Sequence, residues 1–441
     1  MEKFNMGISK DSVLVVWGCG YIGFSDIVFF GQSGRKCIGI DVDPRIKEYV
    51  SQGKYKKDLD AWLDIDYSHL ITNGTIDVTN DASSIIDKNV AAYFLCVPTE
   101  KNGLPEMSVL SDVVEQIVDL EKERNSTVVP VLIESTMVPG TAKKLRAILK
   151  EKLPDKSVYF GVAPRRDWFL GKDKNLVNLP RVLGADSQEA LEYFYSLLSE
   201  VCRNIVVASG YEQSEMCKSV ENAFRHMDII LANQLADAFP SIDIREVLQL
   251  AGTKWNINTY IPSFGTGGYC IPLSSKYLLE GAMNLSGNTI PILSETVYSD
   301  TQRPLNIGEK ILAGMEKGTV GVFGISYKAD TSVIKCSPAL SIVNKLRERG
   351  FEVFITDSEI DKSIIENVTG CTVFNCADRK CLAEFDAVVL CTWHTAFGDP
   401  LSELLPYLKE SCIIYDGTEA PFNGWPEERY RRIGTPSWFL E

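Results

Sequence analysis

Short, continuous apolar runs recur along the first two hundred residues, and each ends at a polar, glycine-containing or proline-containing turn. Runs of this kind are typical of strands in a parallel sheet, because helices cover both faces of such a sheet. We therefore predict an α/β domain with a doubly wound parallel sheet at residues 1–205. Its predicted strands are residues 12–17, 36–40, 91–97, 128–133 and 158–162.

A different pattern marks the middle of the chain. Residues 212–239 contain neither glycine nor proline, and apolar residues recur there at helical spacing. This spacing predicts one long helix, and residues 244–250 form a second, shorter candidate. We place a central helical domain at residues 206–305. Because a helical segment between two α/β domains often forms a dimer interface, we expect a homodimer.

The last third of the chain again alternates apolar runs with helical stretches. Pro338 follows Ser337 and suits the first turn of a helix. Strands that alternate with helices predict a second parallel sheet, in a domain at residues 306–441. The predicted fold is therefore α/β, with two Rossmann-like doubly wound parallel-sheet domains joined by a central segment with a long helix. The predicted strands here are residues 319–324, 351–355, 385–391 and 411–416.

A glycine-rich turn follows the first predicted strand. Gly18, Gly20 and Gly23 form a G-x-G-x-x-G pattern that is followed by an apolar helical stretch, and Asp41 ends the next strand. Such a turn lets the backbone approach a pyrophosphate at a helix N-terminus, and the acid accepts hydrogen bonds from a ribose. Asp41 would repel a 2′-phosphate, so the pattern favours NAD over NADP. The alternative is a glycine-rich turn without a ligand, which the strand, helix and acid together disfavour.

Other cofactor contacts are expected where later strands end. In an open α/β sheet, ligands bind beyond the carboxyl ends of the strands. Thr99 and Thr136 follow two predicted strands and are therefore candidates, although isolated threonines are more often helix N-caps. The complete set of predicted cofactor contacts is Gly18, Gly20, Tyr21, Ile22, Gly23, Asp41, Arg45, Val97, Pro98, Thr99, Ser135 and Thr136.

The candidate nucleophile is Cys270, at the end of the glycine-rich stretch from Phe264 to Pro272. Glycine lets a loop approach a ligand closely, so a thiol after such a loop is well placed to meet a substrate. The alternative is a structural cysteine on a turn, because free cysteine is among the most buried residue types.

Composition excludes several other classes of protein. The chain has 441 residues and a formal net charge of −14, which argues against a broad basic surface for nucleic acid. Twelve scattered cysteines and a polar N-terminal segment without a signal-peptide pattern suggest reduced thiols and a cytoplasmic protein. Three widely separated histidines make a histidine-based metal site improbable, so no metal is expected. No apolar run approaches the roughly 20 residues that a membrane helix needs.

Several short motifs together resemble one enzyme family over nearly the full length of the chain. The chain is similar to the UDP-glucose, UDP-N-acetylmannosamine and GDP-mannose 6-dehydrogenases. Each motif alone is weak, but their order and spacing make the resemblance specific. The motifs are Gly18–Gly23, Cys96–Thr99, Glu134–Thr141, Lys218–Phe224, Gly265–Pro272, Tyr327–Asp330 and Ser337–Pro338.

The resemblance implies a fold, a reaction and roles for residues. NAD would bind the first domain and the nucleotide of the sugar donor the last, and a primary alcohol would be oxidised twice to a carboxylate. Cys270 would form a thiohemiacetal and then a thioester, which water hydrolyses. Lys218 would stabilise an oxyanion, while Asn222 and Thr136 would orient oxygen or water. The implied substrate contacts are Arg165, Lys218, Asn222, Lys254, Tyr260, Phe264, Gly267, Lys328 and Lys335.

The chain departs from the family pattern at positions that matter for chemistry. Ser274 stands where the family has an aspartate, and Arg165 stands where it has a glutamate after a proline. The general base is therefore unassigned. Asp167 could substitute for the missing glutamate if the loop that carries it is shifted. Arg165 would favour a thiolate or bind an anionic group of the substrate. Further departures are Lys335 in place of an arginine, residues 57–60, and the Phe24-Ser-Asp26 stretch after the glycine motif.

Two alternatives to the full oxidation follow from these departures. The first is a related dehydrogenase that acts on an unusual nucleotide substrate or stops at the aldehyde. The second is an inactive relative that binds nucleotides and serves as a partner or sensor. The product formed from a nucleotide sugar separates the first alternative from full oxidation, and the effect of replacing Cys270 tests the second.

Overall fold

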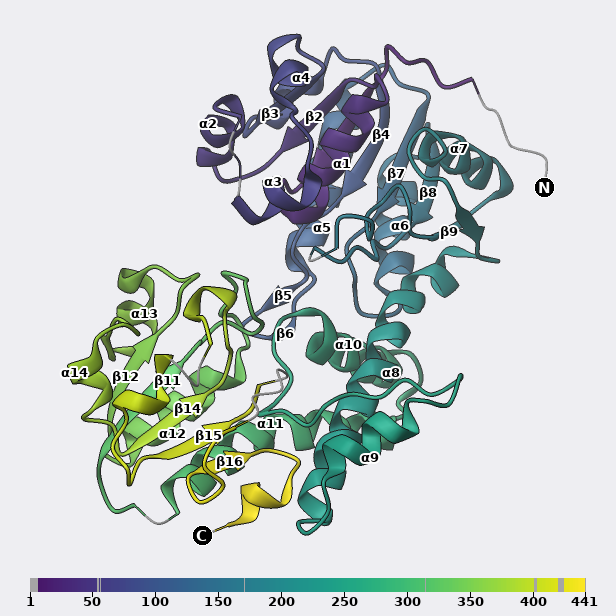
Figure 1. The fold of residues 1–441 in the computed structure, drawn as a ribbon. Coiled ribbons are helices and arrows are strands. Elements are labelled where there is room, and N and C mark those ends of the chain that lie inside the picture. The colour runs from purple at the N-terminus through teal and green to yellow at the C-terminus, as the bar shows by residue number, and fades with distance from the viewer. Residues whose placement is uncertain are drawn as a thin grey trace. The chain divides into compact units, whose positions relative to one another are not determined.

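The computed structural model describes residues 7–53, 55, 57–169, 171–313, 315–399, 403–418 and 424–440. It is an α/β protein with two parallel-sheet regions, as predicted (Figure 1). Contact density divides the chain into two compact units, which we describe separately. Unit 1 comprises Met1–Glu221 and Lys276–Asn288, and unit 2 comprises Asn222–Ser275 and Thr289–Glu441. The three predicted domains stay a prediction, because this division falls inside two helices, α8 (Tyr211–Ala238) and α10 (Cys270–Ser286).

The sheet of unit 1 has the strand order β10-β9-β8-β7-β4-β1-β2-β3. Neighbouring strands are parallel except for the β8–β9 pair, which is antiparallel. A short hairpin of β5 and β6 is separate from it. The strands are β1 Val13–Trp17, β2 Cys37–Ile40, β3 Ile76–Thr79, β4 Val90–Leu95, β5 Glu100–Lys101, β6 Leu104–Pro105, β7 Val128–Ile133, β8 Ser157–Val162, β9 Arg181–Ala185 and β10 Ile205–Val207.

Helices cover both faces of this sheet, which explains the continuous apolar runs. On β1, Leu14 and Val16 pack into the cluster that contains α1, while Val13 and Val15 pack into the cluster that contains α5 and α6. Burial of both faces removes the alternation that a one-sided strand shows. The helices are α1 Tyr21–Gln32, α2 Arg45–Ser51, α3 Lys57–Leu63, α4 Ser68–Thr72, η1 Ala82–Ile85, α5 Ser108–Glu123, α6 Thr141–Lys152 and α7 Gln188–Leu198.

The sheet of unit 2 has the order β13-β12-β11-β14-β15-β16, and its paired strands are parallel. Its two faces pack into separate apolar clusters, so this sheet is also doubly covered. The strands are β11 Thr319–Phe323, β12 Glu352–Thr356, β13 Thr372–Val373, β14 Ala387–Leu390, β15 Ile413–Asp416 and β16 Tyr430–Arg432. The helices are α9 Ile244–Ala251, α11 Pro291–Leu312, α12 Pro338–Glu348, α13 Lys362–Thr369, α14 Arg379–Leu382, η2 Thr395–Phe397, η3 Leu405–Tyr407 and η4 Pro436–Phe439.

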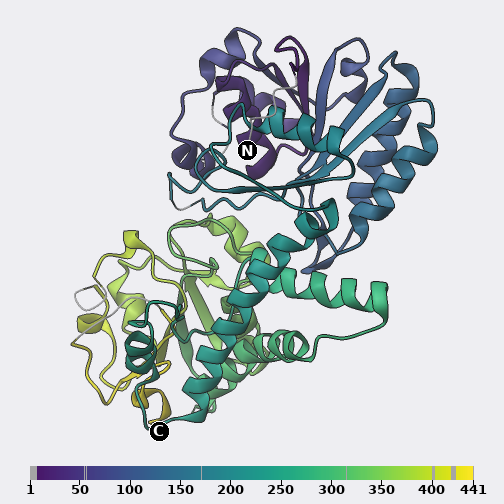
Figure 2. The same ribbon diagram turned by 90° about the vertical axis from the view of Figure 1, so that its right-hand side faces the viewer.

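The predicted long helix is α8, which Figure 2 shows as one unbroken rod in teal. The helix predicted at residues 244–250 is α9, with Asp243 as its N-cap. Sequence reasoning did not identify β3, the β5–β6 hairpin, β9, β10, β13 and β16. It also treated the region of Cys270 as a loop, whereas Cys270 is the first residue of α10.

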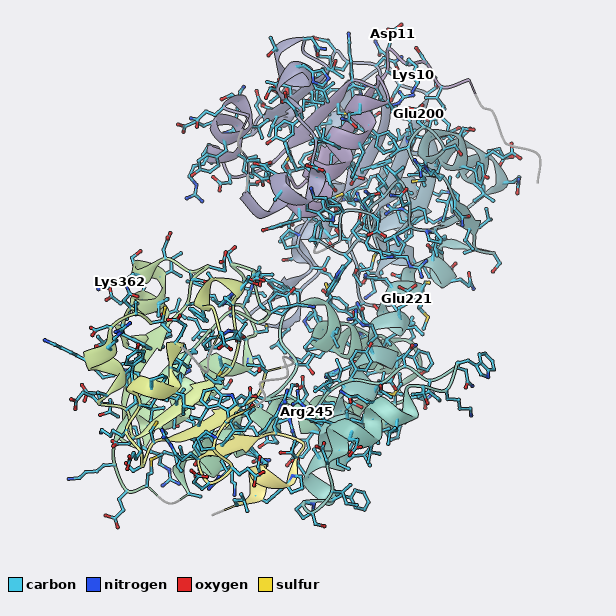
Figure 3. The ribbon with its side chains drawn as sticks, viewed as in Figure 1. Lys10, Asp11, Glu200, Glu221, Arg245 and Lys362 are labelled. Atoms are coloured by element: carbon cyan, nitrogen blue, oxygen red, sulfur yellow. The ribbon has the colours of Figure 1, made fainter. Side chains whose placement is uncertain are left out.

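Charged side chains link distant chain segments within each unit, and Figure 3 labels three of them, Lys10, Glu200 and Arg245. In unit 1, Glu200 accepts hydrogen bonds from Lys10 (2.8 Å) and from the fully buried Arg35. In unit 2, Arg245 of α9 donates to the carbonyls of Thr418 (2.8 Å) and Ile433 (3.1 Å). Burial lowers the pKa of Arg245 to about 10, so this guanidinium remains charged at neutral pH. These contacts fix segments that are far apart in the sequence.

Two compositional predictions can be compared with the structure. Its twelve cysteines are all free thiols, which matches the expectation of a chain without a disulfide framework. Within the described ranges, none of the helices combines the length and the hydropathy that a membrane crossing requires.

Candidate active site

The predicted cofactor residues gather at one edge of the unit 1 sheet. The parallel strands β2, β1, β4 and β7 are neighbours in that order, so their carboxyl ends meet there. Gly18 follows β1 and Asp41 follows β2, while Thr99 and Thr136 lie beyond β4 and β7. This is the edge at which open α/β sheets bind ligands.

The glycine turn has the shape that a pyrophosphate requires. Gly18 has φ +86°, and a Cβ there would lie 2.6 Å from the carbonyl oxygen of Cys96. At Gly23 a Cβ would lie 1.9 Å from the carbonyl oxygen of Gly18. Gly20 differs, because a Cβ there would have no other atom within 4 Å, and it is the N-cap of α1 without a side-chain cap. The first N–H groups of α1 therefore remain available to a phosphate.

Asp41 holds this turn in place. Its Oδ2 accepts a hydrogen bond from the backbone N–H of Cys19 (2.7 Å), and its Oδ1 accepts one from Asp43 N (3.0 Å). Asp41 is a partly exposed residue, and carboxylate oxygens accept more than one hydrogen bond, so a ribose can still be bound. Arg45 begins α2 and is exposed, and its guanidinium pairs with Asp43 (2.7 Å).

The hydroxyl groups beyond β4 and β7 have different environments. Thr99 is buried; its Oγ1 donates to the Thr136 carbonyl (2.6 Å) and lies 2.8 Å from the Tyr277 hydroxyl. Ser135 donates to the Val97 carbonyl (2.7 Å). For the half-buried Thr136 Oγ1 we find no hydrogen bond to other described residues of unit 1. Neither threonine caps a helix, since the N-caps of α5 and α6 are Met107 and Gly140.

Arg165 lies in a buried cluster of charges in unit 1. Its guanidinium donates to Asp26, to Ser25 Oγ (2.9 Å) and twice to Asp167 (2.7 and 2.9 Å). Arg165 is only 4% exposed. These contacts already pair the Arg165 charge, which we had expected to bind an anionic group of the substrate. The predicted substrate contact of Arg165 therefore stays a prediction without support from the geometry of unit 1. They also engage both oxygens of Asp167, which speaks against Asp167 as a general base.

The cluster contains more acids than bases. Glu134 pairs with Arg181 and lies 3.8 Å from Arg165, so three carboxylates face two guanidinium groups. Burial raises the pKa of Asp26 well above its usual range; the Arg165 charge opposes this rise, and the neighbouring Glu134 adds to it. Burial acts against ionisation of Asp167 too, but the Arg165 charge lowers the pKa of that carboxyl. The pKa is therefore raised at Asp26 and lowered at Asp167, although both carboxyl groups contact Arg165. Sequence reasoning noted Asp26 and Arg165 as separate departures and missed that they are partners.

Cys270 is the exposed first residue of α10, in unit 2. Asn222 of α8 donates through Nδ2 to the Cys270 carbonyl (3.2 Å) and to Ser274 Oγ (3.0 Å). Ser274 in turn donates to the Cys270 carbonyl (2.6 Å). The serine found in place of the family aspartate therefore anchors the first turn of α10 together with Asn222.

The glycines before Cys270 pack against the C-terminal half of unit 2. Gly265 and Gly268 have φ values of +148° and +79°. A Cβ at Gly267 would lie 2.7 Å from Tyr327 Cβ, and one at Gly265 would lie 3.2 Å from Pro338. We expected these glycines to admit a ligand, and the contacts give them a packing role. This packing also explains why the Tyr327 and Pro338 motifs accompany the glycine motif.

The remaining predicted substrate residues of unit 2 lie in several environments. Phe264 is 4% exposed and belongs to the apolar core, so its side chain is structural. The Tyr260 hydroxyl accepts a hydrogen bond from Arg225 (3.2 Å), and Lys335 Nζ lies 4.8 Å from the centre of the Tyr269 ring. Lys254 is exposed and Lys328 is half-buried, in the segment that follows β11.

Lys218 and Asn222 are four residues apart in α8, which places them on one face of the helix as predicted. Lys218 is half-buried, and within the described part of unit 1 we find no carboxylate in ion-pair distance of its Nζ. A lysine without a fixed anion can respond to a charge that develops on a substrate.

The turn after β11 resembles the glycine turn of unit 1. Gly324 has φ +75°, and a Cβ there would lie 2.0 Å from the Thr392 carbonyl oxygen. Asp357, after β12, accepts from the N–H groups of Ile325 (2.8 Å) and Ser326 (3.1 Å). His394 Nε2 lies 3.2 Å from Asp357, and both side chains are fully buried. We did not predict a role for His394, because a lone histidine after a strand carries no local signal.

Family models match the chain in three consecutive segments. The UDP-glucose/GDP-mannose dehydrogenase family is represented by its NAD binding domain at residues 12–205, its central domain at 212–300 and its UDP binding domain at 321–420. The chain belongs to this dehydrogenase family. The match confirms the predicted cofactor, NAD, and assigns the glycine turn of unit 1 to the NAD-binding domain of the family. The UDP-binding domain contains the Gly324 turn and indicates a nucleotide-sugar substrate.

Relatives of this dehydrogenase family match nearly end to end. Protein CapL of Staphylococcus aureus is 26% identical over 426 residues, which cover 91% of this chain and 95% of CapL. A UDP-N-acetyl-D-mannosamine dehydrogenase of Methanococcus maripaludis is 24% identical, and the match covers 99% of this chain and 100% of that protein. The structure of a UDP-D-ManNAc dehydrogenase from Pyrococcus horikoshii has a TM-score of 0.81 at 21% identity, covering 96% of this chain and 100% of that one. This last likeness supports the fold.

Proposed function

We propose that the protein oxidises the primary alcohol at the 6-position of a UDP-sugar to a carboxylate, with Cys270 as the nucleophile. The observation that carries the proposal is the exposed thiol of Cys270 at the first position of α10, where Asn222 and Ser274 donate to the backbone carbonyl of the same residue. An exposed thiol at a helix N-terminus is accessible to a carbonyl carbon. An oxyanion on that carbon would also lie near the positive end of the helix dipole.

The proposed reaction has two oxidations. In the first, the alcohol loses a hydride from carbon and a proton from oxygen, which gives an aldehyde. The Cys270 sulfur then adds to the aldehyde carbon, and the oxygen takes up a proton to form a thiohemiacetal. Loss of a second hydride and a proton gives a thioester. Water adds to it, the C–S bond breaks, and the products are a carboxylate and the free thiol. NAD, when bound at the Gly18–Gly23 turn, accepts these hydrides, so two NAD are reduced for each sugar.

Residues of the chain have separate tasks in this proposal. The first turn of α1, with the uncapped Gly20, would hold the pyrophosphate, and Asp41 would hold the ribose. Lys218 would stabilise the oxyanion, and Thr136 Oγ1 would orient water. Asn222 is already committed to the Cys270 carbonyl, so we assign it to holding the thiol as well as the substrate oxygen.

The sugar is proposed from the relatives. Curated relatives are named for UDP-N-acetyl-D-mannosamine and, in Pseudomonas aeruginosa, UDP-N-acetyl-D-glucosamine. We therefore put UDP-linked 2-acetamido sugars first among the substrates, followed by UDP-glucose. The cytoplasm is the proposed location, supported by the free thiols of the chain.

A homodimer is proposed from the surface of unit 2. Large apolar side chains are exposed along its helices, as is usual for faces that associate. They include Phe224 (61% exposed) and Leu231 (56%), which are seven residues apart on one face of α8. Sedimentation of the purified protein tests this proposal, and a monomer at micromolar concentration would contradict it.

A second candidate reaction stops at the aldehyde. The observation that favours it is the pairing of Arg165 with Asp167. Arg165 replaces the glutamate of the family, and the pairing leaves Asp167, the suggested substitute, unsuited to act as the base. In that case one NAD is reduced for each sugar, and the product lacks the additional oxygen of an acid.

The decisive experiment combines product analysis with a variant of the nucleophile. Purified protein is incubated with NAD and each UDP-sugar, NADH is followed by absorbance, and the product is identified by mass spectrometry. Two NADH and a carboxylate per sugar support full oxidation. Cys270→Ser should lower carboxylate formation by roughly 10³-fold or more while NAD binding stays unchanged. Absence of turnover with every sugar, in protein that binds NAD, would support an inactive nucleotide-binding relative instead.

A further inference from the structure

One face of α8 carries buried polar side chains where apolar residues would be expected. Asn222, His226 and Asn233 are spaced by four and seven residues, so they lie along one face of the helix. Asn222, His226 and Asn233 are 3%, 0% and 1% exposed. Buried polar groups need partners, and most of these partners lie in or next to the segment from Ser263 to Ser275 that contains Cys270. We call residues 263–275 the thiol segment.

His226 connects the two sides of the thiol segment. Its Nδ1 lies 2.9 Å from Ser275 Oγ, and its Nε2 lies 3.1 Å from Asp300 Oδ2 on α11. The other oxygen of Asp300 accepts a hydrogen bond from the backbone N–H of Thr266 (2.9 Å). The imidazole is therefore linked to the chain four residues before Cys270 and five residues after it.

The chemistry of the groups sets the direction of these hydrogen bonds. A carboxylate only accepts, so the His226 Nε2 carries a proton toward Asp300. In the neutral imidazole Nδ1 then accepts from the Ser275 hydroxyl. The groups from Ser275 Oγ through His226 and Asp300 to the Thr266 N–H all have partners, and a connected buried network of this kind makes a structure rigid. The buried Thr266 hydroxyl lies outside this chain and has no partner among the described residues.

The backbone between these anchors is poorly constrained by its own sequence. Gly267 and Gly268 separate Thr266 from Tyr269, and Gly268 has φ +79°. Glycine restricts the backbone less than any other residue, so the position of the thiol depends on contacts outside the loop. The anchor at the start is reinforced by Asn233, whose Oδ1 accepts from Ser263 N (2.8 Å).

We propose that His226 is a positioning residue for the Cys270 thiol, acting through Asp300 on one side and Ser275 on the other. The fully buried imidazole does not reach a substrate, and its effect is to keep the sulfur at one place at the start of α10. The catalytic consequence rests on the proposed function, because it requires that the thiol attacks a carbonyl carbon. A displacement of about 1 Å at a reacting group lowers a rate by about 10²-fold.

Thiol reactivity tests the proposal without any sugar or NAD. Iodoacetamide labelling is followed at Cys270 by peptide mass spectrometry, with Cys336 in the same chain as the reference, because both thiols are exposed. In His226→Ala the labelling rate at Cys270 relative to Cys336 should fall about fivefold, as expected when a reacting sulfur loses its fixed place at a helix N-terminus. An unchanged ratio in folded His226→Ala protein would overturn the proposal.

A matched pair of variants at Asp300 separates positioning from general damage. Asp300→Asn keeps an acceptor for Thr266 N, and its amide group can donate to His226 in the other tautomer, so the ratio should stay within about twofold of the wild type. Asp300→Ala removes the acceptor and should lower the ratio as much as His226→Ala does. Equal Cys270-to-Cys336 labelling ratios in the two Asp300 variants would overturn the proposal. If His226→Ala does not fold, this pair of variants provides the test.

Two controls identify general destabilisation. The buried thiols of Cys371 and Cys412 become labelled only when unit 2 opens, so their protection shows that a variant is folded. Tyr93→Phe removes a buried hydroxyl that donates to Glu121 in unit 1, and it should leave the Cys270 ratio unchanged. A fall in Tyr93→Phe equal to that in His226→Ala would count against positioning.

Turnover gives the remaining readout. In His226→Ala, kcat should fall by about 10²-fold while KM for the sugar and the Kd of NAD stay within twofold, and His226→Gln should recover part of kcat because its amide can replace Nε2–H. A change confined to KM would contradict positioning. If the wild type turns over no sugar, the proposed function fails, and the labelling ratios still decide the role of His226.

Discussion

The two sheets place the same type of residue at the same point and use it differently. In unit 1, Asp41 follows the second strand of the glycine motif and accepts from one turn N–H group (Cys19). In unit 2, Asp357 has the equivalent position after β12, but it accepts from two turn N–H groups and its side chain is fully buried against His394. The glycines at the two turns, Gly18 and Gly324, both have positive φ and abut a carbonyl of the neighbouring strand end.

The two turns differ in the segments that come after them. In unit 1 the helix α1 begins at Tyr21, immediately after the turn, so its N-terminus faces the ligand edge. In unit 2 the helix α12 begins at Pro338, and the intervening segment carries Tyr327 and Lys328. The acid of unit 1 is therefore available to a ribose, whereas that of unit 2 is used to fix its own loop. A nucleotide on unit 2 has to be recognised by other groups than this acid.

The largest effect is expected from the buried charges of unit 1. Arg165→Met removes the guanidinium that faces Asp26 and Asp167, and it leaves buried carboxylates without their cation. We expect a loss of about 3–5 kcal/mol in the free energy of unfolding. Urea denaturation checks this value.

A matched double variant controls the Arg165 result. In Arg165→Met with Asp26→Asn, one of the unpaired carboxyl groups is neutralised, so part of the loss should be recovered. No recovery would show that Asp26 is not the partner on which the stability depends. In that case Asp26, the buried acid of α1, would no longer differ from Asp41 in being needed for stability.

The next effect tests whether Asp357 is structural. Asp357→Ala leaves the N–H groups of Ile325 and Ser326 without their acceptor, and it removes the carboxylate that lies 3.2 Å from His394 Nε2. We expect a loss of about 3 kcal/mol in the free energy of unfolding, because each buried group without a partner costs about 1–3 kcal/mol. Thermal or urea unfolding measures this loss. An unchanged unfolding midpoint would show that Asp357 contributes no more to stability than we expect of Asp41.

Asp41 should show the opposite behaviour. Asp41→Asn keeps an acceptor for Cys19 N but removes the charge, so stability should change by less than about 1 kcal/mol. The affinity for NAD should fall about tenfold, and the preference for NAD over NADP should shrink, because the repulsion of a 2′-phosphate is gone. Calorimetric titration with both dinucleotides measures the change. Unaltered affinity for NAD would place the ribose elsewhere.

The smallest expected effect is a difference in acid sensitivity. Burial acts to raise the pKa of Asp357, but the hydrogen bond and charge of His394 lower it below the usual range. A lowered pKa stabilises the fold above the pKa of the unfolded chain, near 3.9, and this contribution is lost as the pH falls toward the folded value. Below about pH 4 the wild type should therefore lose stability more steeply than Asp357→Asn. Parallel stability curves in acid would contradict this assignment.

Local patterns were sufficient for the framework of both units. The continuous apolar runs predicted most strands, because both faces of each sheet are covered by helices. The glycine turn and Asp41 could also be predicted, because the strand, the turn, the helix and the acid occur within one short stretch of sequence. The structure places Gly18, Gly20 and Gly23 as that pattern requires.

Contacts between distant residues were not readable. The Asp26–Arg165 pair joins residues 139 positions apart, so neither departure revealed its partner. The start of α10 was missed because Gly268, Cys270 and Pro272 have the composition of a loop. Pro272 fits there because the first N–H groups of a helix have no acceptor within it. His226 was considered only as one of three widely separated histidines, and its polar neighbours at spacings of four and seven were the overlooked signal.

The packing of the thiol loop has a consequence for reading related genomes. Gly267 is required by the bulk of Tyr327, and Gly265 by Pro338, so these glycines would be kept in a descendant that had lost its cysteine. Retention of the glycine pattern in a newly sequenced homologue therefore reports an intact scaffold. Under the proposed function, the cysteine position next to it is the one that would report surviving catalysis.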